Sequence, residues 1–176
     1  MNLEEFINLF TGRVCDFDGS YSTDKQIQCM DLMHFYKYIC LGIRDKTTLS
    51  APSALSAWNL NYPNLFKKIT NTPTNFPVKG DIIFWGSQAG PAGHVAIVVT
   101  ANSMTFQSFD ANWPISSLPH LQSHYYNGVL GWLHPLVVAS TTPNTPPDWQ
   151  SKVVNVKSLA TLIQQQSNKI IAELSS

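Results

Sequence analysis

The sequence carries little charge and no excess of either sign. Asp, Glu, Lys and Arg make up only 12% of its 176 residues, and the 11 acidic and 11 basic residues cancel. Without an excess of positive charge, the electrostatic attraction that brings proteins to nucleic acid or to an anionic membrane is missing. Hydrophobic residues account for 44% of the chain, which argues against disorder and suffices for a buried core at this length. We therefore expect a folded domain that binds neither nucleic acid nor membrane.

Long apolar runs are also missing, and cysteine is scarce. No run reaches the length of a membrane span, and residues 1–5 lack the basic-then-apolar order of a signal peptide. These features predict synthesis in a cytoplasm, whatever the later destination of the protein. Cys15, Cys29 and Cys40 include no CxxC pair, so their spacing does not predict a zinc site. Cys40 lies on an apolar helical pattern and is expected in the core, whereas the surroundings of Cys15 are ambiguous.

Hydrophobic spacing predicts both helices and strands. The expected helices cover residues 3–10, 29–43 and 52–58. The expected strands are short and apolar and cover residues 82–85, 94–100, 104–109 and 128–133. Polar and turn-forming residues predict loops over 59–77 and 118–127. Short strands joined by short turns imply an antiparallel sheet with helices packed on it, so the predicted fold class is α+β.

The composition changes near the C-terminus. Residues 1–138 are expected to form the folded domain, and the Pro- and Thr-rich stretch 139–150 is expected to be a stiff linker. Residues 151–176 predict an amphipathic helical tail whose apolar stripe is Val156, Leu159, Ile163, Ile170 and Leu174. An isolated helix of this length is marginal in water. We therefore expect the tail to dock on the domain, on a second copy of the chain, or on a further binding region.

A cysteine at a predicted helix start and a histidine at a predicted strand start indicate the chemistry. Cys29 lies in the first turn of its helix, where the backbone N–H groups and the helix dipole favour the thiolate, which is the nucleophilic form. His94 opens the strand that follows the glycine-rich turn 86–93. Folding can bring the two together, and this pair suits a cysteine hydrolase.

Strand alternation suggests a third member of the site. A general base needs another group to fix its orientation. Asp110 lies on the strand next to that of His94, and Asn112 shares the face of Asp110 if the chain stays extended. The helix of Cys29, packed on the face that carries His94, would then bring the thiol to the imidazole.

Four motifs, in this order, resemble those of CHAP domains, which are cysteine- and histidine-dependent amidohydrolases/peptidases. They are Gln28-Cys29-Met30-Asp31-Leu32, Gly80-Asp81-Ile82-Ile83-Phe84-Trp85, Gly93-His94-Val95-Ala96-Ile97-Val98 and Asp110-Ala111-Asn112-Trp113. The resemblance covers roughly residues 3–136. It implies a papain-like fold of the kind shared with NlpC/P60 proteins, with the nucleophilic cysteine at a helix N-terminus.

By motif position, the resemblance implies that Cys29 is the nucleophile and His94 the general base and later the general acid. Asp110 matches a position at which many members carry Glu, and Asn112 matches an Asn two residues further on. The shorter Asp leaves open which of the two orients His94.

Other polar and aromatic residues have weaker indications. The side chain of Gln28 either assists an oxyanion or simply caps the helix or faces solvent. Trp113, beside Asn112, is the best candidate for a wall of the cleft. His120 and His124 fall in a predicted loop and are expected mainly at the surface.

The resemblance implies a peptidoglycan hydrolase, most simply a phage endolysin made in the host cytoplasm and released to the cell wall through a holin. The activity is either that of an N-acetylmuramoyl-L-alanine amidase or that of a peptidoglycan endopeptidase. Both reactions hydrolyse an amide bond, so the motifs do not distinguish them. No organic cofactor is expected. A non-catalytic wall-binding or phage-tail module on the same fold is the main alternative, and a transglutaminase-like or deubiquitinase-like papain relative is a third.

The loop before the nucleophile predicts a calcium site. Asp16 and Asp18 are two residues apart and are followed by a glycine, and calcium prefers carboxylate and carbonyl oxygens on a flexible loop. Some CHAP domains that this sequence resembles bind calcium through a D-x-D-G-x-Y segment just before the cysteine. The expected ligands are Asp16, Asp18 and the carbonyl of Tyr21, then Asp31 and Asp24.

Overall fold

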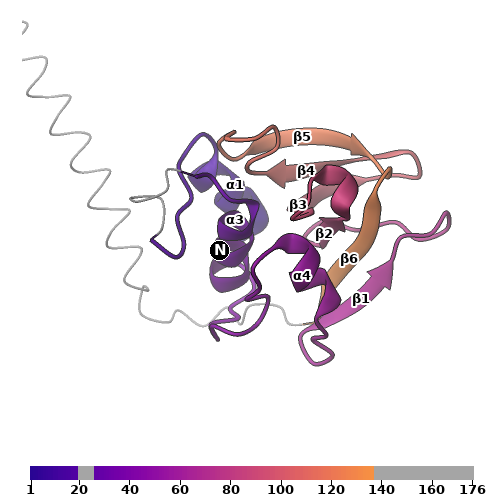
Figure 1. The fold of residues 1–176 in the computed structure, drawn as a ribbon, viewed down its shortest axis with the longest axis horizontal. Helices are drawn as coiled ribbons and strands as arrows, with labels where there is room; N and C mark the ends of the chain where they lie inside the picture. Colours follow the sequence, from indigo (N-terminus) through magenta and orange to yellow (C-terminus); the bar gives the residue numbers. More distant parts are fainter. Residues whose placement is uncertain (20–25, 137–176) are drawn as a thin grey trace, which may run out of the picture. The chain divides into compact units, whose positions relative to one another are not determined.

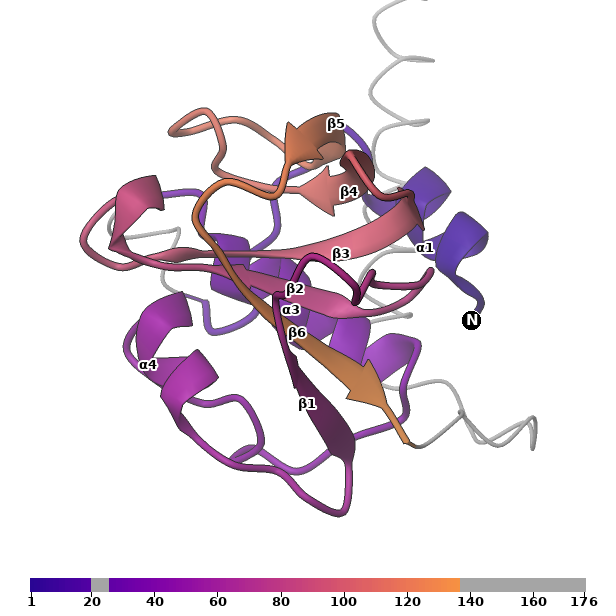
Figure 2. The same cartoon turned by 90° about the vertical axis from the view of Figure 1, so that its right-hand side faces the viewer.

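A six-stranded antiparallel sheet with helices packed against it forms the fold (Figures 1 and 2). The computed structural model describes residues 1–19 and 26–136, all of which belong to one unit of the chain, Met1–Ser140. The strand order is β1-β6-β2-β3-β4-β5. The predicted α+β class is therefore confirmed.

The helices and strands have the following bounds. The helices are α1 (Leu3–Phe10), α3 (Cys29–Ile39), α4 (Ala54–Asn59) and the short 3-10 helix η1 (Ser87–Ala89). The strands are β1 (Phe66–Thr70), β2 (Ile82–Trp85), β3 (His94–Ala101), β4 (Thr105–Asp110), β5 (His120–Tyr125) and β6 (Val129–Pro135). Helix α3 ends at Ile39, so it is shorter than the helix predicted over 29–43.

Two strands lie in segments that the sequence pattern indicated as loops. Strand β1 falls within 59–77 and pairs with β6, and β5 falls within 118–127 and pairs with β4. Both are edge strands and expose many of their residues. The apolar pattern of such strands is weak, because polar side chains at an edge protect it from pairing with other chains. The loop prediction was wrong at both places for this reason.

Each face of the sheet is covered by its own hydrophobic core. The helices pack on one face, where Leu32 and Met33 of α3 join Val95 and Ile97 of β3. The opposite face carries a smaller core of aromatic and aliphatic side chains: Ile83, Trp85, Ala96, Val98, Phe106, Val129 and Trp132. Because side chains alternate along a strand, His94 shares the second face, not the helix face. The expectation that α3 packs on the face of His94 was therefore wrong.

The predicted linker (139–150) and helical tail (151–176) lie outside the described residues and stay predictions. Within the described part of the chain, no helix has the length and apolar character needed to span a bilayer.

Candidate active site

The thiol of Cys29 lies at the very start of α3. Cys29 is the first helical residue and is partly exposed, and the preceding residue, Gln28, is extended. The first N–H groups of a helix have no partner within the helix. Among the described residues, the side chain of Gln28 makes no capping hydrogen bond to them. The start of α3 therefore presents backbone donors beside the sulfur.

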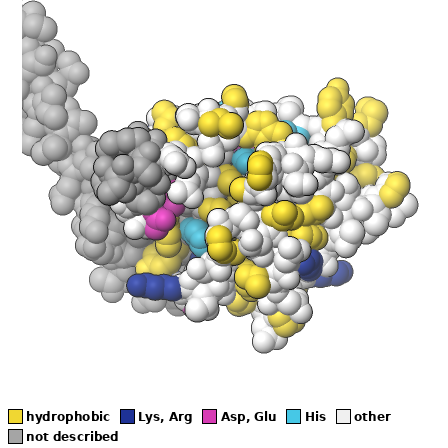
Figure 3. Space-filling view, in the orientation of Figure 1, with side chains coloured by type: hydrophobic (Ala, Val, Ile, Leu, Met, Phe, Trp, Pro, Cys, Tyr) yellow, Lys and Arg dark blue, Asp and Glu magenta, His cyan; other side chains and the backbone are white. Residues whose placement is uncertain are grey.

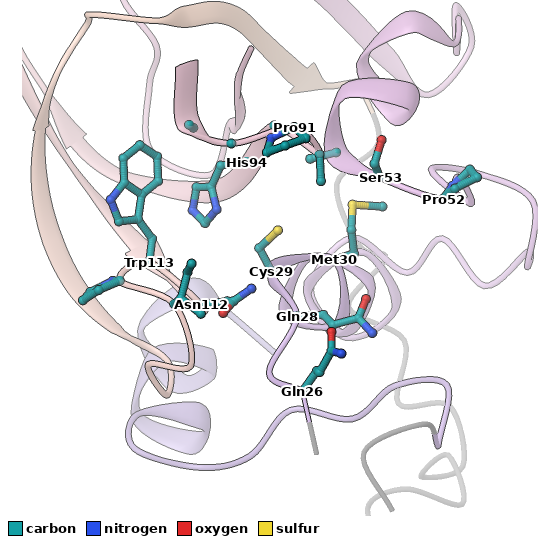
Figure 4. A pocket seen from close by; sticks show the side chains of 17 residues that line it. Gln26, Gln28, Cys29, Met30, Pro52, Ser53, Pro91, His94, Asn112 and Trp113 are labelled. Carbon is teal, nitrogen blue, oxygen red and sulfur yellow. The ribbon is translucent and has the colours of Figure 1, made fainter. Parts of the chain in front are cut away.

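His94 links this thiol to a buried carboxylate. Its Nε2 lies 2.7 Å from Oδ1 of Asp110, and the side chains of the two residues are 5% and 0% exposed. Cys29 lies close enough to the same imidazole to favour its charged form. In Figure 4, the thiol and the imidazole lie next to each other, the first on the helix and the second on the strand. They meet because His94 is the first residue of β3, where the end of the sheet lies open to the helix start.

The surroundings of His94 favour its protonated form. Burial alone would lower the pKa of His94, but the hydrogen bonds and negative charges of Asp110 and Cys29 outweigh it and raise the pKa to about 9. An imidazolium beside a thiolate is the resting state of an activated cysteine nucleophile. The arrangement thus supplies both a nucleophile and an acid.

The Asp110 carboxylate has three hydrogen-bond partners. His94 binds Oδ1, while the hydroxyl of Ser108 donates to Oδ2 at 2.6 Å and Nε2 of His124 lies 3.1 Å from Oδ2. Burial alone would raise the pKa of Asp110, but the hydrogen bonds from the two histidines and from Ser108 lower it. Asp110 is therefore ionised, and both imidazoles donate to it.

His124 is the site residue that the sequence pattern missed. It was expected in a surface loop, but it lies on β5 with a side chain only 7% exposed. The sequence carried one indication of this position: in a strand, side chains alternate, so His120, Gln122 and His124 share one face. That signal becomes useful only once β5 is known to pair with β4.

Asn112 lies at the cleft but makes a different contact from the one expected. Its backbone has a φ of 63°, so the chain leaves the extended conformation directly after β4. Its side-chain oxygen accepts a hydrogen bond from the N–H of Ser116 at 2.7 Å. The assumption of a continued strand was wrong here. Asp110 is the residue that hydrogen-bonds to His94, and Asn112 shapes the loop that carries Trp113.

Trp113 and Gly93 fix the surroundings of His94. The ring of Trp113 packs edge-on against the imidazole, with centroids 4.7 Å apart. Gly93 has a φ of +67°, and a Cβ there would lie 2.6 Å from the backbone oxygen of Trp85. Only glycine suits both the conformation and the space.

An open cleft of about 730 Å³ runs over the thiol. It is lined by Gln26, Gln28, Cys29, Met30, Pro52, Ser53, Ala54, residues 89–94 and residues 112–115. None of these residues is Asp, Glu, Lys or Arg. On the face shown in Figure 3, charged side chains lie at the periphery. A ligand in this cleft would be held by hydrogen bonds and apolar contacts rather than by ion pairs.

Comparison with protein families identifies the domain, since the CHAP domain model matches residues 18–112, more than half of the chain. The chain belongs to the CHAP domain family. The matched range contains Cys29, His94 and Asp110. A search of curated proteins found no match.

Several solved structures share the fold of this CHAP domain. A crystal structure of the wild-type endolysin LysIME-EF1 is 25% identical, with a TM-score of 0.58, and the match covers 79% of this chain and 66% of that one. Ly7917 is 18% identical with a TM-score of 0.53, covering 77% and 63%. Its structure with the hydrolyzing product of MDP is 19% identical with a TM-score of 0.52, covering 75% and 62%. The chain thus spans just under two thirds of the length of these neighbours.

The loop that precedes α3 in the CHAP domain brings carboxylates together. Burial raises the pKa of Asp31 to about 6, and the negative charges of Asp18 and Asp16 contribute to this shift. The N–H of Phe17 donates a hydrogen bond to Oδ1 of Asp31 at 3.1 Å, which lowers the pKa of Asp31 and partly offsets this rise. Crowded carboxylates are stabilised by a hard cation such as calcium. The donor chemistry of the loop therefore fits the predicted metal.

The described part of this loop is not by itself a complete metal site. Within residues 1–19 and 26–136, no group of three or more His, Cys, Asp or Glu side chains is arranged to hold a metal ion. Two of the expected ligands, Tyr21 and Asp24, lie outside the described residues. The calcium site stays a prediction.

Proposed function

We propose that this chain is a peptidoglycan hydrolase that cleaves an amide bond with Cys29 as nucleophile. The observation that carries this proposal is the continuous contact from the Cys29 thiol through His94 to the buried carboxylate of Asp110. This chain of groups lies on an open cleft. A nucleophile, a base and a group that orients the base are what amide hydrolysis by cysteine requires.

The proposed mechanism gives each group a role. Nε2 of His94 is bound by Asp110, so Nδ1 is the nitrogen available to the thiol. The Cys29 thiolate attacks the carbonyl carbon, and backbone N–H groups at the start of α3 stabilise the oxyanion. The imidazolium of His94 then gives its proton to the leaving amine, and a thioester forms. His94 next takes a proton from water, and the resulting hydroxide attacks the thioester, releasing the acid and restoring the thiolate.

Peptidoglycan is the proposed substrate because of the family and its neighbours. The chain is a CHAP domain, and LysIME-EF1, with the same fold, is an endolysin. Because none of the residues that line the cleft is Asp, Glu, Lys or Arg, it suits a polymer recognised through amides and hydroxyls. N-acetylmuramoyl-L-alanine amidase and endopeptidase activity are both consistent with this chemistry. As part of the same proposal, the enzyme reaches the wall from the host cytoplasm through a holin.

A non-catalytic wall-binding or phage-tail module is the competing function. Binding alone would not need a thiol beside a histidine, nor a carboxylate buried behind that histidine. Burying such a carboxylate costs free energy unless hydrogen bonds compensate for it. The presence of the full set therefore favours catalysis.

Calcium forms a second part of the proposal. Asp16, Asp18 and the carbonyl of Tyr21, then Asp31 and Asp24, would hold the ion before α3. The ion would offset the repulsion among these carboxylates. Its role would be structural, holding the helix start that carries Cys29.

Mass spectrometry of the fragments released from purified Gram-positive peptidoglycan tests the function directly. The wild-type protein is expected to release fragments with new amino groups, and their masses identify the bond that is cut. Cys29→Ser is expected to release none while melting at the wild-type temperature, because a serine hydroxyl does not ionise near neutral pH.

Cys40→Ser is the matched control. The Cys40 thiol is buried, and burial raises its pKa to about 12. This variant is expected to keep its activity and to lose some stability. Hydrolysis by Cys29→Ser would contradict the mechanism, and a wild-type protein that binds walls but releases no fragment would favour the binding module.

A further inference from the structure

The second oxygen of Asp110 has partners that the proposed mechanism does not use. Oδ1 contacts His94, whereas Oδ2 is bound by Ser108 at 2.6 Å and by Nε2 of His124 at 3.1 Å. A buried carboxylate bound only through one oxygen could rotate about its side-chain bonds. Contacts on both oxygens, from three strands, fix the plane of the carboxylate.

The ring of His124 is itself held by aromatic side chains. It stacks on Phe106 with centroids 5.5 Å apart, and it packs against Trp85 at 5.0 Å and Trp113 at 5.1 Å. These neighbours come from β4, from β2 and from the loop after β4, and none is charged. With its ring enclosed in this way, His124 keeps Nε2 directed at Asp110.

We infer that His124 is a positioning residue, whose Nε2–H holds the Asp110 carboxylate so that Oδ1 faces His94. The inference rests on the proposed cysteine mechanism and adds a fourth side chain to it. His124 touches neither Cys29 nor the reacting atoms; it acts through Asp110. Ser108 supplies the companion hydrogen bond on the same oxygen.

Losing the His124 donor weakens the whole chain of contacts. The hydrogen bond from His124 favours the ionised form of Asp110, and Asp110 in turn stabilises the His94 imidazolium that accompanies the thiolate. Among the described residues, the titratable groups in these contacts are His94 on β3, Asp110 on β4 and Cys29 on α3. Removing the donor lets the carboxylate turn away from Nε2 of His94, which should lower the reactivity of Cys29 at acidic pH.

Alkylation of Cys29 by iodoacetamide, measured against pH by peptide mass spectrometry, reports this effect without any substrate. In His124→Leu, the ratio of the alkylation rate at pH 6 to that at pH 10 is expected to fall about threefold or more. In His124→Gln, whose amide N–H can replace Nε2–H, the ratio is expected to recover to within about twofold of wild type. His120→Gln, the same change on the same strand outside the site, should match wild type.

Peptidoglycan hydrolysis gives the second readout. His124→Leu is expected to lower kcat by about 10- to 100-fold with little change in KM, the size of effect seen when the hydrogen-bond partners that orient metal-binding histidines are removed. His124→Gln should recover most of the loss. If wild type shows no hydrolysis but the alkylation profiles differ as expected, the proposed substrate is wrong and the positioning role stands.

Two outcomes would overturn the inference. One is a folded His124→Leu protein with the wild-type alkylation profile and kcat. The other is a His124→Gln protein as impaired as His124→Leu, which would mean that ring packing matters and the hydrogen bond does not. If His124→Leu does not fold, His124→Gln decides alone: near-wild-type alkylation supports the role, and a loss as large as in Asp110→Asn contradicts it.

Discussion

Raising the pH from neutral should weaken the fold through His94. Its pKa is about 9 in the folded chain against an ordinary value of 6.5. A histidine whose pKa is higher in the folded than in the unfolded chain contributes its full stabilisation at pH values below the unfolded pKa. This stabilisation is lost as the pH rises through the folded pKa. The side chain is 5% exposed, so solvent screening does not reduce the effect much.

The size of the effect follows from the two pKa values. Their difference corresponds to about 3 kcal/mol of unfolding free energy at low pH, of which about 2 kcal/mol is lost between pH 7 and 8.5. Three other buried groups whose pKa values are shifted affect stability mainly outside this window. The buried ring of His34, with a pKa lowered to about 4, affects stability mainly below pH 7. The thiols of Cys15 and Cys40, with pKa values raised to about 12, affect it mainly above pH 8.5.

Urea unfolding followed by circular dichroism at several pH values between 7 and 8.5 measures this loss. The variants are made on Cys29→Ser, because an imidazolium–thiolate pair binds no more protons than the neutral histidine and thiol of the unfolded chain, which would cancel the effect in the wild type. The free energy of unfolding of Cys29→Ser should fall by up to about 2 kcal/mol. When Asp110→Asn is added, the fall should largely disappear, because the partner that stabilises the imidazolium has lost its charge. When His120→Gln is added instead, the fall should remain. A Cys29→Ser free energy constant to within about 0.5 kcal/mol, or an equal slope with Asp110→Asn, would refute the account of His94 and Asp110 as an ion pair.

Three further predictions concern the loops around the site. If calcium binds before α3, a chelator should lower both the melting temperature and the rate of hydrolysis, and added calcium should restore them. The double variant Asp16→Ala/Asp18→Ala should show the same loss without a chelator. Full activity and an unchanged melting temperature in chelator would exclude the site. Gly93→Ala should lower the free energy of unfolding by more than about 2 kcal/mol and abolish activity. Gly12 has a similar φ of +69° but open space around it, so Gly12→Ala should lose only about 1–2 kcal/mol through backbone strain. Equal losses of stability in thermal unfolding would contradict the predicted clash at Gly93. Asn112→Ala should lower kcat by less than Asp110→Asn does, because Asn112 orders the Trp113 loop rather than His94.

The sequence predicted the parts of this molecule that depend on local pattern. Helix α1 and the buried strands β2 and β3 have strong apolar periodicity, and the order of the CHAP motifs identified Cys29 and His94 as candidates. Strand β5 carries no such pattern, and its place beside β4 depends on long-range pairing. His124 was missed for that reason. The prediction of the sheet face on which α3 packs was wrong, because the alternation of side chains tells which residues share a face but not which face the helices cover.

The two hydrophobic cores have a consequence for how the protein would lose activity. Cys29 packs against the core beneath the helices, whereas the ring of His94 packs with the tryptophans of the opposite core. The sulfur and the imidazole are therefore carried by separate layers, and their alignment depends on how one layer sits on the other. A small slip between the layers would disable turnover while nearly all secondary structure survives. For selecting robust variants, the half-life of activity at elevated temperature is thus a better criterion than the temperature of unfolding.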